Sequence, residues 1–175
     1  MVSDATEARW FSSVCRRAGF QGDVGVMVEV PAAALRARSI AAEVDFLSIG
    51  TNDLAQYCFA ADRQLGALAR LQDPWQPALL DLVAGTAAAA GEAGRGCGVC
   101  GEAAADPALA CVFVGMGVTS LSMVGPALAG VRAALHRHTL AACTQAAAAA
   151  RTADTAESAR VAARAALPGL ADIGY

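Results

Sequence analysis

The chain has 175 residues, of which 56% are hydrophobic, and it carries a formal net charge of −3. A chain of about 100–200 residues with this composition is typical of one globular domain around a single core. All thirteen cationic residues are arginines, and the calculated pI is near 5.3. Because no basic surface is indicated, nucleic acid is not an expected partner.

Two features argue against export and membrane insertion. The N-terminal residues MVSDATEARW include acids where a secretory signal would carry cations and a long apolar core, so we expect a cytoplasmic location. The stretch between Asp106 and Arg132 carries no charge and is long enough to span a bilayer. Glycine, serine, threonine and proline interrupt it, however, which favours helix, turn, strand and turn.

Four short apolar runs alternate with helix-like segments along the chain. Each run has the length of a strand, and they are Val24–Val30, Asp45–Ile49, Cys97–Cys100 and Ser120–Met123. A proline after a capping or strand-end residue predicts where each following helix starts, at Pro31, Pro74, Pro107 and Pro126. Residues 139–175 are rich in alanine with dispersed charges, which predicts one or two amphipathic helices with a frayed end.

This alternation predicts an α/β fold. Strands nearly free of polar residues and separated by helices favour a parallel sheet covered on both faces, as in an open α/β sheet or a (β/α) barrel. A complete eight-stranded barrel needs about 250 residues, so four units correspond to half a barrel or to a small open sheet.

The six cysteines raise the question of a metal site or a disulfide. If Cys97 and Cys100 lie on one strand, they point to opposite faces and can neither share a ligand nor form a bridge without distortion. No second CxxC motif or nearby histidine pair completes a zinc site. We therefore expect reduced, mostly buried thiols.

Two carboxylates end neighbouring strands in this interpretation. Chemistry in α/β barrels gathers at the C-terminal ends of the strands, where Glu29 and Asp53 are placed. Two carboxylates at one mouth form an oxygen site suited to Mg²⁺, which also takes oxygens from a substrate phosphate. The alternative for Glu29 is an ion pair with a helix arginine such as Arg36 or Arg38.

Three further polar side chains stand near the same strand ends. Asn52 could cap a short helix over Leu54–Ala60. Arg63 follows that helix, and a guanidinium can grip phosphate or carboxylate in bidentate fashion, although a solvated surface position explains a single arginine equally well. Cys100 ends the third strand, and a thiol with an ordinary pKa of about 8.5 is protonated at neutral pH and can act as an acid.

Three segments carry a resemblance to a known family. They are GVMVEVPAAAL (Gly25–Leu35), DFLSIGTNDLAQYCFAADR (Asp45–Arg63) and GVCGEAAADPALA (Gly98–Ala110). Together they resemble the phosphoenolpyruvate-binding domain of Enzyme I of the bacterial sugar phosphotransferase system. The resemblance implies that residues 1–138 form the last four β/α units of a TIM-type (β/α)8 barrel, with residues 139–175 as a C-terminal helical tail. Ala105 stands where the family commonly has glycine.

The resemblance also implies roles for the candidate residues. Glu29 and Asp53 match the family's metal ligands, which hold Mg²⁺, and Asn52, Asp53 and Arg63 match positions that bind phosphoenolpyruvate. Cys100 matches the cysteine that delivers a proton to the methylene carbon of the enolate, giving pyruvate. In the family the phosphoryl group passes to a histidine on a separate N-terminal domain and then to the phosphocarrier HPr.

Parts of this machinery are not expected within these 175 residues. His136 and His138 do not match the phosphohistidine motif and are predicted to lie at a solvated helix end. The chain should therefore act together with the other half of the barrel, supplied by a longer chain or a separate polypeptide. One alternative is a catalytically incompetent fragment or a homodimeric half-barrel scaffold closed through its edge strands. Another is a relative of pyruvate phosphate dikinase or phosphoenolpyruvate synthase, although SIGTNDLAQY together with AADR favours Enzyme I.

Overall fold

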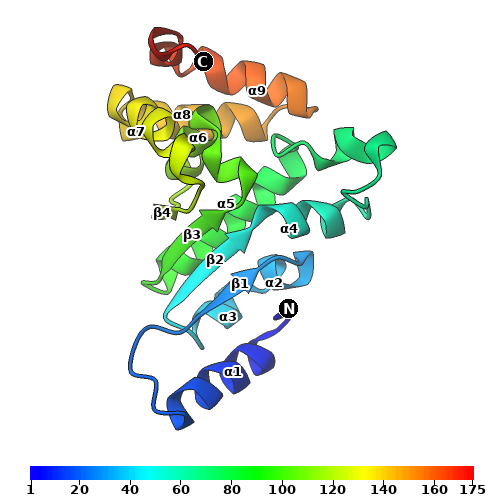
Figure 1. Cartoon of the computed structure of the whole chain (residues 1–175), viewed down its shortest axis with the longest axis vertical. Coiled ribbons are helices and arrows are strands. Elements are labelled where there is room, and N and C mark those ends of the chain that lie inside the picture. Colours follow the sequence, from blue (N-terminus) through cyan, green and yellow to red (C-terminus); the bar gives the residue numbers. More distant parts are fainter.

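The computed structural model describes all 175 residues around a central parallel sheet (Figure 1). The strands follow one another in chain order and are β1 (Gly25–Val28), β2 (Phe46–Gly50), β3 (Gly96–Cys100) and β4 (Ser120–Leu121). Every neighbouring pair is parallel, and helices lie in each connection, as parallel pairing requires. The predicted α/β fold with four parallel strands is confirmed, and its strand order is consistent with part of a TIM-type barrel.

The chain is mostly helical. The α-helices after β1 are α2 (Pro31–Leu35), α3 (Ala37–Ala41), α4 (Thr51–Cys58), α5 (Pro77–Glu92), α6 (Pro107–Gly115), α7 (Leu128–Arg137), α8 (Leu140–Arg151) and α9 (Ala156–Ala165). The 3₁₀ helices are η1 (Gly66–Gln72), η2 (Glu102–Ala105), η3 (Gly125–Ala127) and η4 (Pro168–Ile173). None of these helices combines the length and the apolar composition needed to cross a membrane.

Two of the four predicted helix starts are confirmed and two are displaced. Pro31 and Pro107 begin α2 and α6, and Asp106 caps α6 by accepting hydrogen bonds from the next turn. Helix α5 begins at Pro77 and not at Pro74, because the Asp73 carboxylate accepts the Trp75 N–H at 2.9 Å and holds a tight turn first. The fourth segment begins as η3 before α7 follows.

An N-terminal helix precedes the sheet and was not predicted from the sequence. Helix α1 (Ala5–Arg17) starts at Asp4, whose carboxylate accepts the N–H groups of Thr6 at 2.7 Å and Glu7 at 2.9 Å. Ion pairs from Arg9 to Glu43 at 2.7 Å and from Arg16 to Asp45 at 2.6 Å connect it to the rest of the fold, below β1 in Figure 1.

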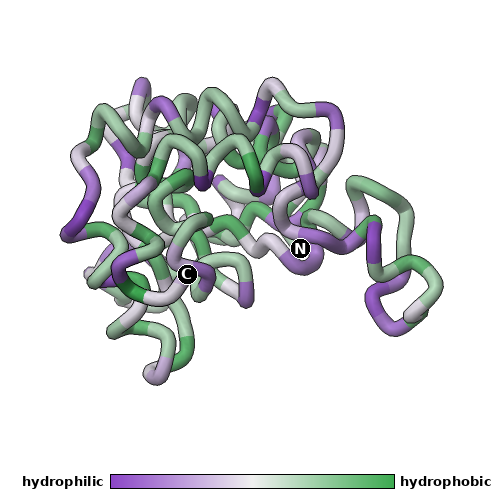
Figure 2. The backbone as a smooth tube through the Cα atoms, turned by 90° about the horizontal axis from the view of Figure 1, so that it is seen from above, coloured by the Kyte–Doolittle hydropathy of each residue, from purple (hydrophilic) through white to green (hydrophobic).

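The sheet buries only one of its faces, which corrects the expectation of a sheet covered on both. Alternate residues such as Val28, Leu47 and Val99 are buried against the helices. The residues between them face the other way, and Met27 and Phe46 remain 43% and 39% exposed. Figure 2 shows hydrophobic residues along most of the trace, with short and separate hydrophilic stretches. In a complete barrel, this open face would line the interior.

The C-terminal segment folds onto the sheet-bearing part as two helices. Helix α8 packs closely on α6, where Gly115 lies against the backbone of Cys143. Residues of α8, α9 and η4 share one hydrophobic cluster with the strands, and Leu167 and Leu170 are almost completely buried. The structure has two helices where one or two were expected, whereas the expected frayed end is wrong because η4 packs against α7.

The two histidines differ in their surroundings. His136 is exposed, as expected for a solvated helix end. His138 is half-buried, its Nδ1 lies 2.8 Å from the Ala134 carbonyl oxygen, and its Nε2 is buried without a hydrogen-bond partner. The prediction of a solvated position is therefore wrong for His138, because the packing of Gly169 from the C-terminal segment covers the ring.

All six cysteines are free thiols, and those on β3 lie on opposite faces of the sheet. Cys97 is buried on the helix side, and Cys100 is half-buried on the open side. Burial raises the pKa of the Cys97 thiol to about 11, because the surrounding apolar groups disfavour the thiolate.

The buried Cys97 makes stability sensitive to alkaline pH. The folded chain keeps this proton while the unfolded chain loses it above about pH 9, so we expect the free energy of unfolding to fall between about pH 9 and pH 11. Urea unfolding at pH 8, 9 and 10 measures the slope. Cys97→Ala should make the slope shallower without abolishing it, because burial also raises the pKa of the Cys111 thiol, to about 12. An unchanged slope in Cys97→Ala would contradict the raised pKa of the Cys97 thiol.

Candidate functional site

The candidate residues gather at the C-terminal edge of the sheet. Glu29 directly follows β1, Asn52 and Asp53 lie in the first turn of α4 after β2, and Cys100 is the last residue of β3. The register pairs Gly50 with Cys100, so the ends of β2 and β3 are level. A Cβ atom placed on Gly50 would lie 3.3 Å from the Glu29 Cβ, which shows that Glu29 stands beside the start of α4.

Helix α4 starts without the capping side chain that the sequence indicated. The chain passes from β2 at Gly50 straight into the helix at Thr51, and no side chain caps the first turn. Asn52 and Asp53 are therefore the second and third helical residues, which corrects the prediction that Asn52 is the cap and that Asp53 ends a strand. The Thr51 hydroxyl instead donates to the Cys100 carbonyl at 3.0 Å and ties α4 to β3.

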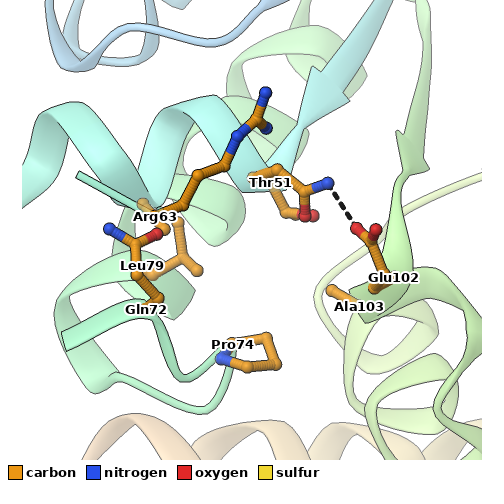
Figure 3. Close-up of a pocket in the computed structure, with 9 residues that line it drawn as sticks. Thr51, Arg63, Gln72, Pro74, Leu79, Glu102 and Ala103 are labelled. Carbon is orange, nitrogen blue, oxygen red and sulfur yellow. Dashed lines mark hydrogen bonds between the residues drawn. The ribbon is translucent and has the colours of Figure 1, made fainter. Parts of the chain in front are cut away.

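Asn52 is oriented by the loop that follows β3. Its amide nitrogen donates a short hydrogen bond to Glu102 Oε2, drawn as the dashed line in Figure 3. This bond holds the pKa of the Glu102 carboxyl below its ordinary value. Gly101 allows the approach because its φ of 91° suits glycine and because a Cβ there would lie 3.1 Å from the Thr51 hydroxyl oxygen. No feature of the sequence pattern predicted this direct contact between Glu102 and Asn52.

Arg63 reaches back to the start of α4. Its Nη1 lies 3.5 Å from Asp53 Oδ1, and its backbone N–H donates to Gln56 Oε1 at 3.3 Å. The chain turns after α4 at Ala60, whose φ of 48° lies in the left-handed region. With 51% of its side chain exposed, Arg63 keeps donors available for a ligand.

A pocket of about 480 Å³ lies between α4, the η1 segment and η2 (Figure 3). Gln72 and Pro74 border it on the side opposite Glu102 and Ala103, with Thr51 between the two sides. The lining residues are Thr51, Asn52, Ala55, Arg63, Gln72, Pro74, Leu79, Glu102 and Ala103. The sequence predicted two of them, Asn52 and Arg63. It gave no signal for Gln72 and Pro74, which reach the pocket through loop geometry.

The other three candidates lie around this pocket and do not line it. Glu29 borders a second pocket of about 450 Å³, formed with α1 and β1. Cys100 lies on the open face of the sheet, with its Sγ 3.4 Å from the Ile49 carbonyl oxygen. Asp53 faces Arg63. The structure therefore brings Asn52 and Arg63 into one pocket and places Glu29, Asp53 and Cys100 along the same edge of the sheet.

Glu29 is free of the ion pair considered as its alternative role. Arg38 pairs with Glu92, and neither a hydrogen bond nor an ion pair engages the Glu29 carboxylate. No group of three or more His, Cys, Asp or Glu side chains could hold a metal ion by itself. Mg²⁺ commonly needs only one or two protein carboxylates and takes its remaining oxygens from substrate and water, so Glu29 and Asp53 stay candidates for holding it.

Comparisons with known proteins show the family to which the chain belongs. The family described as "PEP-utilising enzyme, PEP-binding domain" matches residues 12–140, where PEP is phosphoenolpyruvate. The chain is 65% identical over 169 residues to the phosphoenolpyruvate-protein phosphotransferase of Streptomyces coelicolor, covering 97% of this chain and 30% of that protein. It is 46% identical over 114 residues to the protein of the same name from Latilactobacillus sakei, covering 65% and 20%.

A multiphosphoryl transfer protein from Xanthomonas campestris is 39% identical over 165 residues, covering 91% of this chain and 20% of that protein. The chain thus spans a third or less of the length of these relatives. The resemblance to Enzyme I predicted from the three sequence segments is confirmed, and the four-stranded α/β fold agrees with it. Since the match covers most of the chain, the chain belongs to the PEP-binding domain family of PEP-utilising enzymes.

Proposed function

We propose that this chain is the C-terminal part of the PEP-binding barrel of a phosphoenolpyruvate-protein phosphotransferase, binding PEP together with Mg²⁺. The observation that carries the proposal is the pocket in which Asn52 and Arg63 converge at the strand ends, within a chain that belongs to the PEP-binding family. An amide and a guanidinium are suitable partners for the carboxylate and phosphate of PEP.

Each residue at this edge has a part in the proposed reaction. Arg63 and Asn52 bind and orient the anionic substrate, and Glu102 fixes the orientation of the Asn52 amide. Glu29 and Asp53 would hold Mg²⁺, which when bound neutralises charge on the phosphate. When the bond between phosphorus and the enol oxygen breaks, the thiol of Cys100 gives its proton to the methylene carbon and pyruvate forms.

The remaining steps need groups from outside these 175 residues. The phosphoryl group would pass to a histidine of another domain and from there to HPr, which serves sugar uptake. The names of the relatives support this system, because they are phosphoenolpyruvate-protein phosphotransferases and multiphosphoryl transfer proteins. They also favour it over pyruvate phosphate dikinase or phosphoenolpyruvate synthase. A cytoplasmic location is part of the same proposal.

Substitution of Arg63 tests the proposal. We expect Arg63→Ala to weaken PEP binding in the presence of Mg²⁺ by about tenfold to 100-fold, because a charged hydrogen bond contributes about 1.5–3 kcal/mol. Isothermal titration of the chain with PEP measures this change. Arg70→Ala, which removes another exposed arginine from the same loop, is the matched control. Equal affinities for the two variants would contradict a binding role for Arg63.

The open face of the sheet supports a second candidate function, a half-barrel that associates with another copy of itself. Trp10, Phe11 and Met27 are 64%, 41% and 43% exposed and lie together beside the first strand. Exposed apolar side chains at a sheet edge favour association. Light scattering after size exclusion separates the candidates, because a stable dimer without PEP binding supports the scaffold. A monomer that turns over PEP when the rest of a phosphotransferase is added supports the enzyme.

A further inference from the structure

Helix α9 contacts the loop that forms one wall of the candidate pocket. It spans Ala156–Ala165 and so lies beyond residue 140, where the family match ends. Arg160 on this helix donates from Nη2 to both carboxylate oxygens of Asp73, at 3.1 and 3.0 Å. Its guanidinium carbon also lies 5.8 Å from the centre of the Trp75 ring, within the range of a cation–π contact.

Asp73 and Trp75 form one hydrogen-bonded unit at the end of the loop. The Asp73 carboxylate accepts the Trp75 N–H at 2.9 Å, and the Trp75 side chain is completely buried. The Trp75 indole N–H donates to Asp106 Oδ2 at 3.3 Å, while Asp106 Oδ1 caps α6. The unit therefore connects the loop after α4 with the loop after β3, the two segments on opposite sides of the pocket.

Besides this unit, the loop is held by Arg63, which contacts Asp53 and Gln56, and by the Gln76 amide, which donates to the Arg70 carbonyl at 3.0 Å. Residues 62–70 are exposed apart from half-buried Leu68, and η1 has no buried residue. The amide of Gln72 closes the loop by donating to the Ala61 carbonyl, next to Arg63. Gln72 and Pro74, on either side of Asp73, line the pocket. The position of the segment between Gln72 and Pro74 thus depends in part on how Asp73 is held.

A cavity separates the rest of this loop from the start of α9. It has a volume of about 560 Å³, and Arg70, Asp73, Gln76, Asp154 and Arg160 are among its lining residues. Arg160 reaches Asp73 at the border of this cavity, so the ion pair is a local contact and not part of a continuous packed interface. Asp73 and Arg160 expose 25% and 39% of their side chains, so solvent partly screens the pair, in which the single nitrogen Nη2 contacts both carboxylate oxygens.

We propose that Arg160 is a positioning residue for the pocket: through Asp73 and Trp75 it holds the loop of residues 61–76 in the shape that lets Arg63, Gln72 and Pro74 meet a ligand. The inference rests on the proposed function for the identity of that ligand, PEP. The contact between α9 and the loop is independent of the proposed function. The C-terminal helices thereby affect substrate affinity without touching the substrate.

The test compares Arg160→Ala with Arg160→Lys and with Arg164→Ala, an exposed arginine one turn further along α9. Hydrogen exchange of the chain without ligand measures the loop directly. We expect Arg160→Ala to speed exchange in residues 61–76 by about fivefold or more while the strands keep their protection, because local opening is independent of global unfolding. Lysine should restore part of the protection, and Arg164→Ala should match the unchanged chain.

Titration with PEP and Mg²⁺ tests the effect on binding. We expect the affinity of Arg160→Ala to fall about fivefold, at the lower end of couplings between separate sites. Faster exchange in the loop with unchanged affinity would overturn the positioning role. Unchanged exchange, or a uniform rise over all strands, would overturn the inference as well. Failure of the unsubstituted chain to bind PEP would instead count against the proposed function, and hydrogen exchange would then decide whether Arg160 holds the loop.

Discussion

Glu29→Ala and Asp53→Ala are each expected to weaken the Mg²⁺-dependent binding of PEP by about 100-fold, equivalent to about 2.8 kcal/mol. Both carboxylates stand at the C-terminal edge of the sheet, and that of Glu29 has no partner within the protein. Removal of either one leaves a single protein carboxylate for the ion. Isothermal titration with PEP, at several Mg²⁺ concentrations, measures the loss.

The controls separate metal binding from general electrostatics. Glu92→Ala removes an exposed carboxylate from the end of α5, at the opposite edge of the sheet, and should leave affinity unchanged. Asp53→Ala also frees Arg63 from its partner at 3.5 Å, so Asp53→Asn, which keeps the size of the side chain, is measured beside it. PEP affinity that does not depend on Mg²⁺, or that survives in Glu29→Ala, would show that the proposed metal pair is wrong.

Gly115→Ala is expected to destabilise the chain by about 3 kcal/mol, at the upper end of typical overpacking effects. A Cβ atom on Gly115 would overlap the backbone carbonyl of Cys143 and lie 2.7 Å from the Thr144 nitrogen. These atoms belong to the backbone of α8, which cannot move aside as the end of a flexible side chain could. The two helices would have to separate and lose part of their buried contact. Urea unfolding measures the change in free energy.

Gly85→Ala is the matched control for that substitution. Gly85 lies within α5, and a Cβ atom there would meet nothing within 4 Å. Alanine is favoured over glycine in a helix by about 0.5–1 kcal/mol, so this variant should be slightly more stable. If Gly115→Ala were as stable as the unsubstituted chain, α8 would not be seated on α6 as described.

The strands were predictable from the sequence because each is a short apolar run that ends before a proline or polar turn. The runs Asp45–Ile49 and Cys97–Cys100 agree with β2 and β3 to within about a residue at each end. Helix α1 was not predicted, although Asp4 followed three residues later by Glu7 is an N-terminal capping pattern. For the strands and for α1, residues close in sequence are therefore sufficient to predict the element.

The candidate site was only partly predictable, for reasons of tertiary geometry. Parallel strands in a barrel imply that their C-terminal ends meet, so the common edge of Glu29, Asp53 and Cys100 followed from the fold class. The capping role of Asn52 was wrong because β2 passes into α4 without a loop, and the Asn52 amide is used by Glu102 instead. Gln72 and Pro74 enter the pocket through a loop whose closure depends on Trp75 and Arg160, far apart in sequence.

The one-sided sheet has a consequence for how sequence variation would act in this chain. Along β2, Leu47 and Ile49 meet the helices, whereas Ser48 between them faces the open side. The side chains that face the helices contribute most of the free energy of folding, whereas those on the open side contact a ligand that enters the barrel. A library that varies only the open-side positions would therefore explore new ligand preferences on an intact scaffold. Varying the intervening positions would mainly yield chains that fail to fold.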